Sequence, residues 1–319
     1  MSPQHESAPV TPAPPEARLH RHARPALSFE LFPARSEAPV ERLHRTIDEL
    51  LTVEPDFVSV TSKPGRSNFA EVCALVQYLA DHTSVRPLVH LTCTAMGAEE
   101  LRRTVHEILD MGVRGILALR GDYPAGHSPE TDELPFARYL VELIREVESE
   151  RITSLAAGRV SIGVAAYAVR HPESATFQHD VEVLLAKERS GANFAITQVF
   201  WDAAEYSHLV ARARRAGVTI PILPGFLPTG DPLRLLRLQE LTGVPVPRPF
   251  MHALLSARSD DERFELGAER ASALMNECLD QGAPGVHLYT FNQHRDALAA
   301  LERVNLERYF HRDAHARVA

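Results

Sequence analysis

The chain has few cysteines and no long apolar run. Its 319 residues include three cysteines, Cys73, Cys93 and Cys278, which are far apart and odd in number. They predict neither a disulfide framework nor a Cys-x-x-Cys metal site, so a reducing cytoplasm is the expected compartment. No apolar stretch approaches the roughly 18 residues that a membrane-spanning helix needs, and the N-terminus lacks the apolar centre of a signal peptide. We therefore expect neither membrane insertion nor secretion.

An excess of positive charge is also missing. The chain has 34 Lys and Arg against 42 Asp and Glu, a formal net charge of −8. Proteins that bind nucleic acid usually have a basic surface, so nucleic acid is not an expected partner. With 45% hydrophobic and 24% charged residues, the chain can instead bury a sizeable core, as a soluble enzyme does. The sequence leaves the state of assembly open, a homo-oligomer included.

Residues 1–27 differ from the rest of the chain in composition. They contain six of the 23 prolines and almost no large apolar side chains. Such a segment buries too little apolar surface to offset the entropy lost on ordering. We predict a flexible tail over residues 1–27, one catalytic domain over 28–310 and a short C-terminal tail over 311–319.

From residue 28 onward, short apolar runs rich in β-branched and aromatic residues alternate with longer segments of helical period. This alternation predicts parallel strands that are each followed by a helix. Eight such units over about 280 residues favour a (β/α)8 barrel over an open doubly wound sheet, which more often has about five to seven strands. The predicted strands are 28–33, 57–61, 87–93, 115–121, 161–167, 194–200, 220–226 and 285–291.

Glycines mark the ends of three predicted helices. Gly112, Gly191 and Gly217 each stand between a helical segment and a predicted strand, where a residue in the left-handed conformation commonly ends a helix. In a barrel of this class, the catalytic groups lie on the loops after the carboxyl ends of the strands. Polar residues at the ends of the predicted strands are therefore the candidates for function.

Glu30 stands inside an apolar strand, between Phe29 and Leu31. An unpaired carboxylate in such a place would cost several kcal/mol, so we expect Glu30 to be paired or protonated. Burial raises the pKa of a carboxyl group, which suits a general acid that works near neutral pH. The structural alternative is an ordinary salt bridge to an arginine of a neighbouring strand.

Two further polar residues end predicted strands. Asp122 follows Gly121, which would let a ligand approach the backbone closely, although Arg120 and Asp122 would equally suit a structural turn. Gln198 offers two hydrogen-bond donors and an acceptor. An amide of this kind suits the edge of a fused heterocycle, and it also suits an internal hydrogen bond.

Two histidines are placed to present an imidazole at the mouth of such a barrel, His90 in a strand and His171 after one. A catalytic metal needs about three protein ligands, and neither histidine has a carboxylate companion or a His-x-x-x-His spacing. No metal is therefore expected. The Gly-x-Gly-x-x-Gly fingerprint and the Gly-rich phosphate loop are both absent, so any nucleotide must bind in another way.

Taken in order, eight segments resemble those of the methylenetetrahydrofolate reductase family. They are SFELFP, FVSVT, HLTCT, ILALRGD, GVAAY with a following His171-Pro172, GANFAITQVFWD, ILPGFLP and PGVHLYTFN, and they extend from residue 28 to about 294. The resemblance implies a (β/α)8 barrel that reduces 5,10-methylenetetrahydrofolate to 5-methyltetrahydrofolate with hydride from NADH or NADPH, normally through bound FAD. It thereby implies a folate substrate, a nicotinamide dinucleotide and a place in one-carbon metabolism.

The resemblance also implies roles for individual residues. Glu30 matches the general acid that helps open the methylene bridge, Asp122 matches an aspartate near flavin and pterin, and Gln198 matches the glutamine that contacts folate and nicotinamide in turn. Gln293 occupies a substrate-binding position at which the family has an arginine. The positions similar to those that line the flavin are Thr61, His90, Arg120, Gly121, Asp122, Tyr167, His171, Asp180 and Lys187.

The sequence departs from the family pattern chiefly around the flavin. An asparagine and an arginine that help hold its ribose and phosphates are replaced by Val183 and Ala186. Each lost charged hydrogen bond costs about 1.5–3 kcal/mol, so the two changes together would weaken FAD binding by several orders of magnitude unless Lys63 or Arg66 compensates. The aromatic residue that covers the substrate after strand seven is replaced by Pro232.

Several functions therefore stay open at the level of sequence. The first, and the one that the sequence favours, is a reductase that works through FAD, with direct hydride transfer from the nicotinamide and a degenerate flavin site as its alternative. A folate-binding methyltransferase barrel would hold the pterin without moving a hydride. A folate-sensing or subunit-stabilising protein would keep the barrel alone, and the presence of Glu30, Asp122 and Gln198 argues against it.

Overall fold

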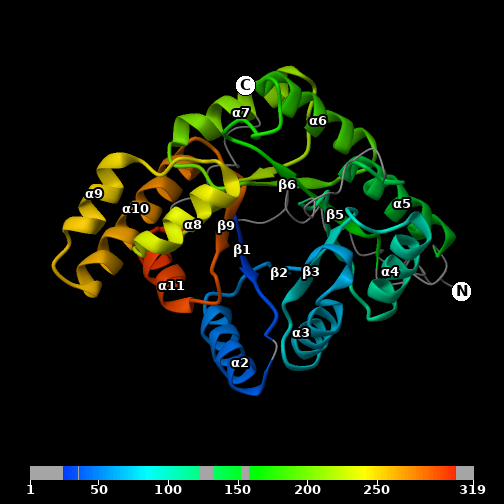
Figure 1. Ribbon diagram of the computed structural model, residues 1–319, viewed down its shortest axis with the longest axis horizontal. Helices are drawn as coiled ribbons and strands as arrows, with labels where there is room; N and C mark the ends of the chain where they lie inside the picture. Colours follow the sequence, from blue (N-terminus) through cyan, green and yellow to red (C-terminus); the bar gives the residue numbers. More distant parts are fainter. Residues whose placement is uncertain (1–23, 35, 123–131, 152–157, 307–319) are drawn as a thin grey trace, which may run out of the picture.

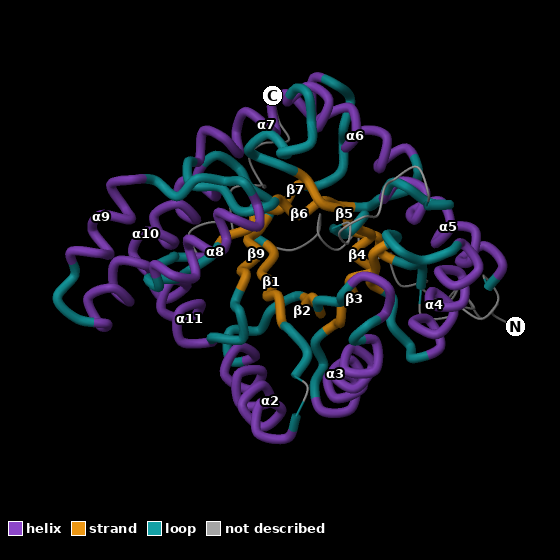
Figure 2. The backbone as a smooth tube through the Cα atoms, viewed as in Figure 1, coloured by secondary structure: helices purple, strands orange, loops and turns teal. Residues whose placement is uncertain are grey.

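The computed structural model describes residues 24–34, 36–122, 132–151 and 158–306. Parallel strands form a ring, and helices surround it (Figures 1 and 2). This is the predicted (β/α)8 barrel. Most of the two predicted tails, residues 1–23 and 311–319, lies outside the described residues. The first strand begins at Ala26, two residues before the expected start, because Ala26 and Leu27 are already buried in the sheet.

Within the described residues, the sheet has nine parallel strands in the order β7-β6-β5-β4-β3-β2-β1-β9-β8. The seventh predicted strand, 220–226, is split in two around Pro224, which has no N–H for the sheet ladder. One half, β7, pairs with β6, and the other half, β8, pairs with β9. The bounds are β1 Ala26–Leu31, β2 Phe57–Val60, β3 Arg86–Thr92, β4 Gly115–Leu119, β5 Ser161–Ala166, β6 Phe194–Thr197, β7 Ile222–Leu223, β8 Gly225–Phe226 and β9 Gly285–Tyr289.

The helices pack one apolar stripe against the outside of the sheet. In α4, Ala98–Asp110, the apolar stripe of Leu101, Val105 and Ile108 is fully buried. No helix in the described ranges is long and apolar enough to cross a membrane. The bounds are α2 Glu37–Leu51, η1 Pro64–Arg66, α3 Phe69–His82, α4 Ala98–Asp110, α5 Ala137–Glu150, α6 Phe177–Arg189, α7 Ala203–Arg215, α8 Pro232–Thr242, α9 Arg248–Ser256, α10 Asp260–Asp280 and α11 His294–Glu302.

The predicted glycine caps are confirmed. Gly112, Gly191 and Gly217 follow the ends of α4, α6 and α7 with φ angles of 81°, 114° and 94°. These values lie in the left-handed region, which glycine enters without the steric penalty of a Cβ atom. Each glycine thus turns the chain from an outer helix towards the next strand.

Alternate residues of each strand face the inside of the barrel. On β1, Leu27, Phe29 and Leu31 belong to the large core between sheet and helices, whereas Ala26 belongs to a separate apolar cluster. That second cluster joins β1, β3, β4, β6 and β7 through Ala26, Leu88, Leu117, Phe194, Ile196 and Leu223. Because side chains alternate along a strand, Glu30 shares the inward face of Ala26.

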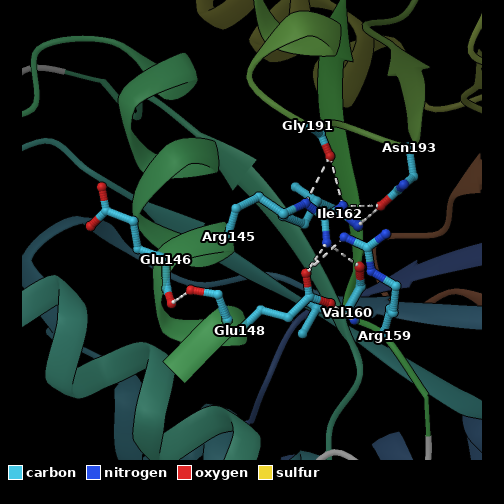
Figure 3. A network of polar contacts seen from close by, with 9 residues as sticks. Arg145, Glu146, Glu148, Arg159, Val160, Ile162, Gly191 and Asn193 are labelled. Carbon is cyan, nitrogen blue, oxygen red and sulfur yellow. Dashed lines mark hydrogen bonds and ion pairs between the residues drawn. The ribbon is translucent and has the colours of Figure 1, made fainter. Parts of the chain in front are cut away.

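A polar network around Arg145 on α5 lies at the amino-terminal ends of β5 and β6 (Figure 3). The guanidinium donates to the carbonyl oxygens of Val160 and Gly191 and to Oδ1 of Asn193 at 2.6–3.0 Å. It also pairs with the buried carboxylate of Glu148 at 2.8 Å. The network fixes α5 to the segments that lead into β5 and β6, at the end of the barrel that serves stability rather than catalysis.

Candidate active site

Most of the predicted site residues meet at the carboxyl ends of the strands. Parallel strands of a barrel all end at the same mouth, so residues that are far apart in the sequence come together there. Two of them, Glu30 and His90, lie within β1 and β3, and Thr61, Arg120, Gly121, Asp122, Tyr167 and Gln198 follow the ends of β2, β4, β5 and β6. Three more, His171, Asp180 and Lys187, lie between β5 and α6 or on α6.

The carboxyl group of Glu30 is nearly buried, with 12% of its side chain exposed. Burial raises the pKa of Glu30 from 4.5 to about 8, so the group carries its proton at neutral pH. Among the described residues, no lysine or arginine forms an ion pair with it, so the alternative of a salt bridge to a neighbouring arginine is wrong. The expectation of a protonated carboxyl group agrees with this environment.

The ionisable partner of Glu30 is His90 on β3. Its Nε2 atom lies 3.6 Å from Oε2 of Glu30 and has no hydrogen-bond partner in the described part of the chain. Burial lowers the pKa of His90 to about 3, so the imidazole is neutral. A neutral pair is expected, because a low-dielectric interior disfavours the charged form of both groups. The proton therefore stays on Glu30.

The strand β9 supplies two inward-facing residues that the sequence analysis did not single out. Nδ1 of His287 forms a hydrogen bond of 2.9 Å with the hydroxyl of Ser28. Burial lowers the pKa of His287 to about 3. Tyr289, which pairs in register with Glu30, donates its hydroxyl to the carbonyl oxygen of Thr197 at 2.6 Å. Their alternation with apolar residues in the predicted strand 285–291 was the signal that would have found them.

Two cations expected to line the flavin already have partners within the protein. The guanidinium of Arg120 donates two hydrogen bonds to the carboxylate of Glu173, at 2.6 and 2.9 Å. The ammonium of Lys187 is buried and donates to the carbonyl oxygen of Ala165 at 2.8 Å, and burial lowers its pKa to about 8. Both cations thus have partners within the described part of the chain.

Asp180, the acidic residue expected beside the flavin, also has partners within the protein. The buried carboxylate of Asp180 accepts from the backbone N–H of His171 at 3.0 Å and from the hydroxyl of Ser174. The ring of His171 in turn packs edge-on against Tyr167, with 4.6 Å between the ring centroids. These contacts connect the loop between β5 and α6 to the first turn of α6.

The residues on α6 fit the ribose and phosphates of FAD less well than those of the family pattern. Val183 is 37% exposed and Ala186 is half-buried on α6, where the resemblance implies an amide and a guanidinium. Arg66 does not compensate, because it pairs with Glu107 and stacks on Phe69. Of the expected flavin-lining groups, the hydroxyl of Thr61 is buried without a hydrogen-bond partner in the described residues.

The remaining predicted residues lie nearer to solvent. The side-chain oxygen of the half-buried Gln198 accepts from the backbone N–H of Val199 at 2.9 Å. Asp122 and Gln293 are exposed at the rim, after β4 and before α11. Among the described residues, no three His, Cys, Asp or Glu side chains are grouped closely enough to hold a metal ion.

Comparison with known proteins places this chain in a family. A sequence model described as methylenetetrahydrofolate reductase matches residues 16–305. The chain belongs to the methylenetetrahydrofolate reductase family. The 5,10-methylenetetrahydrofolate reductase of Escherichia coli (strain K12) is 33% identical over 270 residues, which cover 84% of this chain and 86% of that protein.

Relatives in eukaryotes carry names that specify the nucleotide. The "probable methylenetetrahydrofolate reductase (NADPH)" of Caenorhabditis elegans is 29% identical, and "methylenetetrahydrofolate reductase (NADH) 1" of Arabidopsis thaliana is 28% identical. They match 91% and 88% of this chain, which spans 43% and 48% of their own lengths. Both nucleotides therefore occur in the names of the family.

A solved structure shares the fold. It is described as an uncharacterized protein from Clostridium thermocellum that binds two copies of 5-methyl-5,6,7,8-tetrahydrofolic acid. The match covers 90% of this chain and 98% of that one with a TM-score of 0.63, at 14% identity. At this identity the likeness supports the barrel architecture alone.

Proposed function

We propose that this chain reduces 5,10-methylenetetrahydrofolate to 5-methyltetrahydrofolate, with hydride from NADH or NADPH and a proton from Glu30. The observation that carries the proposal is the neutral pair of Glu30 and His90, buried at the mouth of a barrel of this family. A protonated carboxyl group with a pKa of about 8 can act as an acid at neutral pH.

The reaction needs one proton and one hydride. Glu30 donates its proton to the bridge nitrogen that leaves the methylene carbon, and the C–N bond breaks with its electron pair going to that nitrogen. The carbon is left as an iminium ion with the other nitrogen. Hydride from the nicotinamide adds to that carbon, which gives the methyl group and the oxidised nucleotide. Glu30 then regains a proton from solvent, so atoms and charge balance.

The surroundings of Glu30 favour this step. Neutral His90 does not hold the proton of Glu30, and the carboxylate left after the transfer is stabilised by the positive iminium ion. We propose that Asp122 at the rim adds a second negative charge near the cation. Gln198 would exchange its bond to Val199 N for the edge of the heterocycle, first of the folate and then of the nicotinamide.

We favour direct hydride transfer from the nicotinamide to the iminium carbon. Direct transfer is supported by the paired state of Arg120 and Lys187 and by the apolar Val183 and Ala186. FAD, which the resemblance implies, would find few free partners for its phosphates among these residues. When bound, FAD would accept the hydride and pass it on, and Thr61, Tyr167, His171 and Asp180 would be the residues beside it.

Two measurements test this proposal. The first is NADH or NADPH oxidation that depends on 5,10-methylenetetrahydrofolate and yields 5-methyltetrahydrofolate; its absence with both nucleotides would leave the methyltransferase alternative. The second is the visible spectrum of untagged protein, with activity compared with and without added FAD. A colourless protein with full activity supports direct transfer, and a yellow protein with one FAD per chain contradicts it.

We also propose that the enzyme works in the cytoplasm. The thiols of Cys73, Cys93 and Cys278 are all free, as expected for a protein in a reducing compartment. Labelling of these thiols in freshly lysed cells, with and without prior reduction, would check this proposal.

A further inference from the structure

We infer that a small cavity between α10 and the loop after β6 binds a single halide ion, chloride in physiological buffers, through the indole N–H of Trp201 and the guanidinium of Arg270. None of the predicted site residues lines this cavity. The inference therefore does not rest on the proposed function.

The cavity lies where the loop after β6 meets β8 and two outer helices. Its apolar walls come from that loop, from β8, from α9 and from α10: Phe200, Phe226, Phe250 and Leu274. It has room for about one water-sized group. The helix α10 also lies directly on the segment after β8, because a Cβ atom at Gly267 would come within 2.4 Å of the backbone nitrogen of Gly230. This close packing leaves α10 little freedom to move in and fill the space.

Two hydrogen-bond donors of the residues that line the cavity lack an acceptor. Nε1 of Trp201 and Nε of Arg270 are shielded from solvent and have no hydrogen-bond partner among the described residues. Trp201 is 8% exposed, and the two residues are neighbours, because a terminal N–H of Arg270 donates to the carbonyl oxygen of Trp201. Burial of an N–H without an acceptor is unfavourable, so a ligand that accepts from both atoms would be stabilised here.

The half-buried Arg270 also carries a charge without a counter-ion. In the part of the chain that the structure describes, no carboxylate forms an ion pair with it, whereas Arg263 on the same helix pairs with Asp260. The carboxylate of Glu205 instead accepts from the backbone N–H of Trp201 at 3.2 Å. A partly buried guanidinium of this kind favours an anion beside it.

A halide ion fits these features better than a water molecule or a larger anion does. A water molecule would accept from both N–H groups, but its own two hydrogens would face apolar and aromatic side chains. A carboxylate, sulfate or phosphate group has more atoms than a space for one water-sized group admits. A monatomic anion accepts from any direction, has no hydrogens of its own and balances the charge of Arg270.

Trp201 is the single tryptophan of the chain, so its fluorescence reports on this cavity directly. We would titrate the purified full-length protein with sodium bromide, holding the ionic strength constant with sodium gluconate, whose anion is too large for the cavity. The emission of the wild type should change along a saturable curve, and chloride should compete with bromide. Arg270→Met should show only the linear decrease of collisional quenching. The matched control Arg263→Met should behave as the wild type does.

A linear decrease in the wild type, equal to that of Arg270→Met, would overturn the inference and leave the cavity to water. Thermal unfolding provides a second readout that does not depend on fluorescence. An ion that binds only the folded state should raise the midpoint by about 2 °C at about ten times its dissociation constant. Replacing gluconate by chloride should produce this rise in the wild type and in Arg263→Met.

Two variants should lose more than half of the rise. They are Arg270→Met, which lacks the charge, and Trp201→Phe, which keeps an aromatic ring but lacks the N–H. If Arg270→Met does not fold, Trp201→Phe alone decides the test. A rise in Trp201→Phe as large as that of the wild type would overturn the assignment, because the ion would then bind elsewhere.

Discussion

Oε2 of Glu30 lies 3.6 Å from Nε2 of His90, and both groups are neutral at pH 7. Two such residues at the surface would form a charged pair near pH 5.5. Here burial penalises either charge, so the proton remains on the carboxyl group and the imidazole stays unprotonated. At pH 7 the carboxyl group of Glu30 therefore carries a proton beside the predicted substrate site.

The pH dependence of catalysis follows from this pair. Because Glu30 must be protonated to act, kcat should be nearly constant between pH 6 and 7 and should fall as pH rises through about 8. The titration of His90, whose pKa is about 3, lies outside this range. Steady-state rates from pH 6 to pH 10 would check the profile, and a kcat that increases above pH 8 would speak against an acid role.

Replacing Glu30 by glutamine should stabilise the fold while it removes activity. The folded pKa of about 8 exceeds the ordinary 4.5, so the folded state keeps a proton that the unfolded chain loses, and stability falls as pH rises from 4.5 to 8. Glu30→Gln removes this pH-dependent loss. The free energy of unfolding of the variant should therefore exceed that of the wild type by at most about 3 kcal/mol at pH 7. Denaturant unfolding at pH 5 and pH 8 should show a larger gain at pH 8. An equal or smaller gain at pH 8 would mean that Glu30 is not held protonated by burial.

Arg145→Ala should destabilise the protein by about 3–5 kcal/mol, because it removes the close ion-pair partner of the Glu148 carboxylate, which is 7% exposed. The backbone N–H of Val160 and the exposed Arg159 would be its remaining partners. Arg102→Ala is the control: its partners Glu146 and Glu150 are exposed, so the loss should stay below about 1 kcal/mol. Chemical denaturation measures both. If the two variants lost equal free energy of unfolding, burial of the Arg145 network would not contribute to stability.

Restoring the missing anchors should improve flavin binding. Val183→Asn with Ala186→Arg supplies the amide and guanidinium that the family pattern has, and FAD titration of the purified protein should show at least about tenfold tighter binding. The control variant Glu182→Gln, at an exposed position of the same helix, should not change the affinity for FAD. An unchanged FAD affinity in the double variant would mean that other residues decide whether the flavin binds.

The strands and the glycine caps could be predicted because their signals are local. The start of β1 at Ala26 and the break at Pro224 could not, because burial and pairing with distant strands decide them. At the site, the apolar neighbours of Glu30 predicted its raised pKa. Its partner His90, and the bonds between Asn292 and Phe32 across 260 residues of chain, depend on the closed barrel.

The most direct test of the account is the rate of NADH or NADPH oxidation by Glu30→Gln at saturating 5,10-methylenetetrahydrofolate. The amide has nearly the shape of the protonated carboxyl group but cannot donate its proton in the same way, so the rate should fall about a hundredfold to ten-thousandfold while 5-methyltetrahydrofolate still binds. A variant that binds folate and reduces it at the wild-type rate would contradict the central claim.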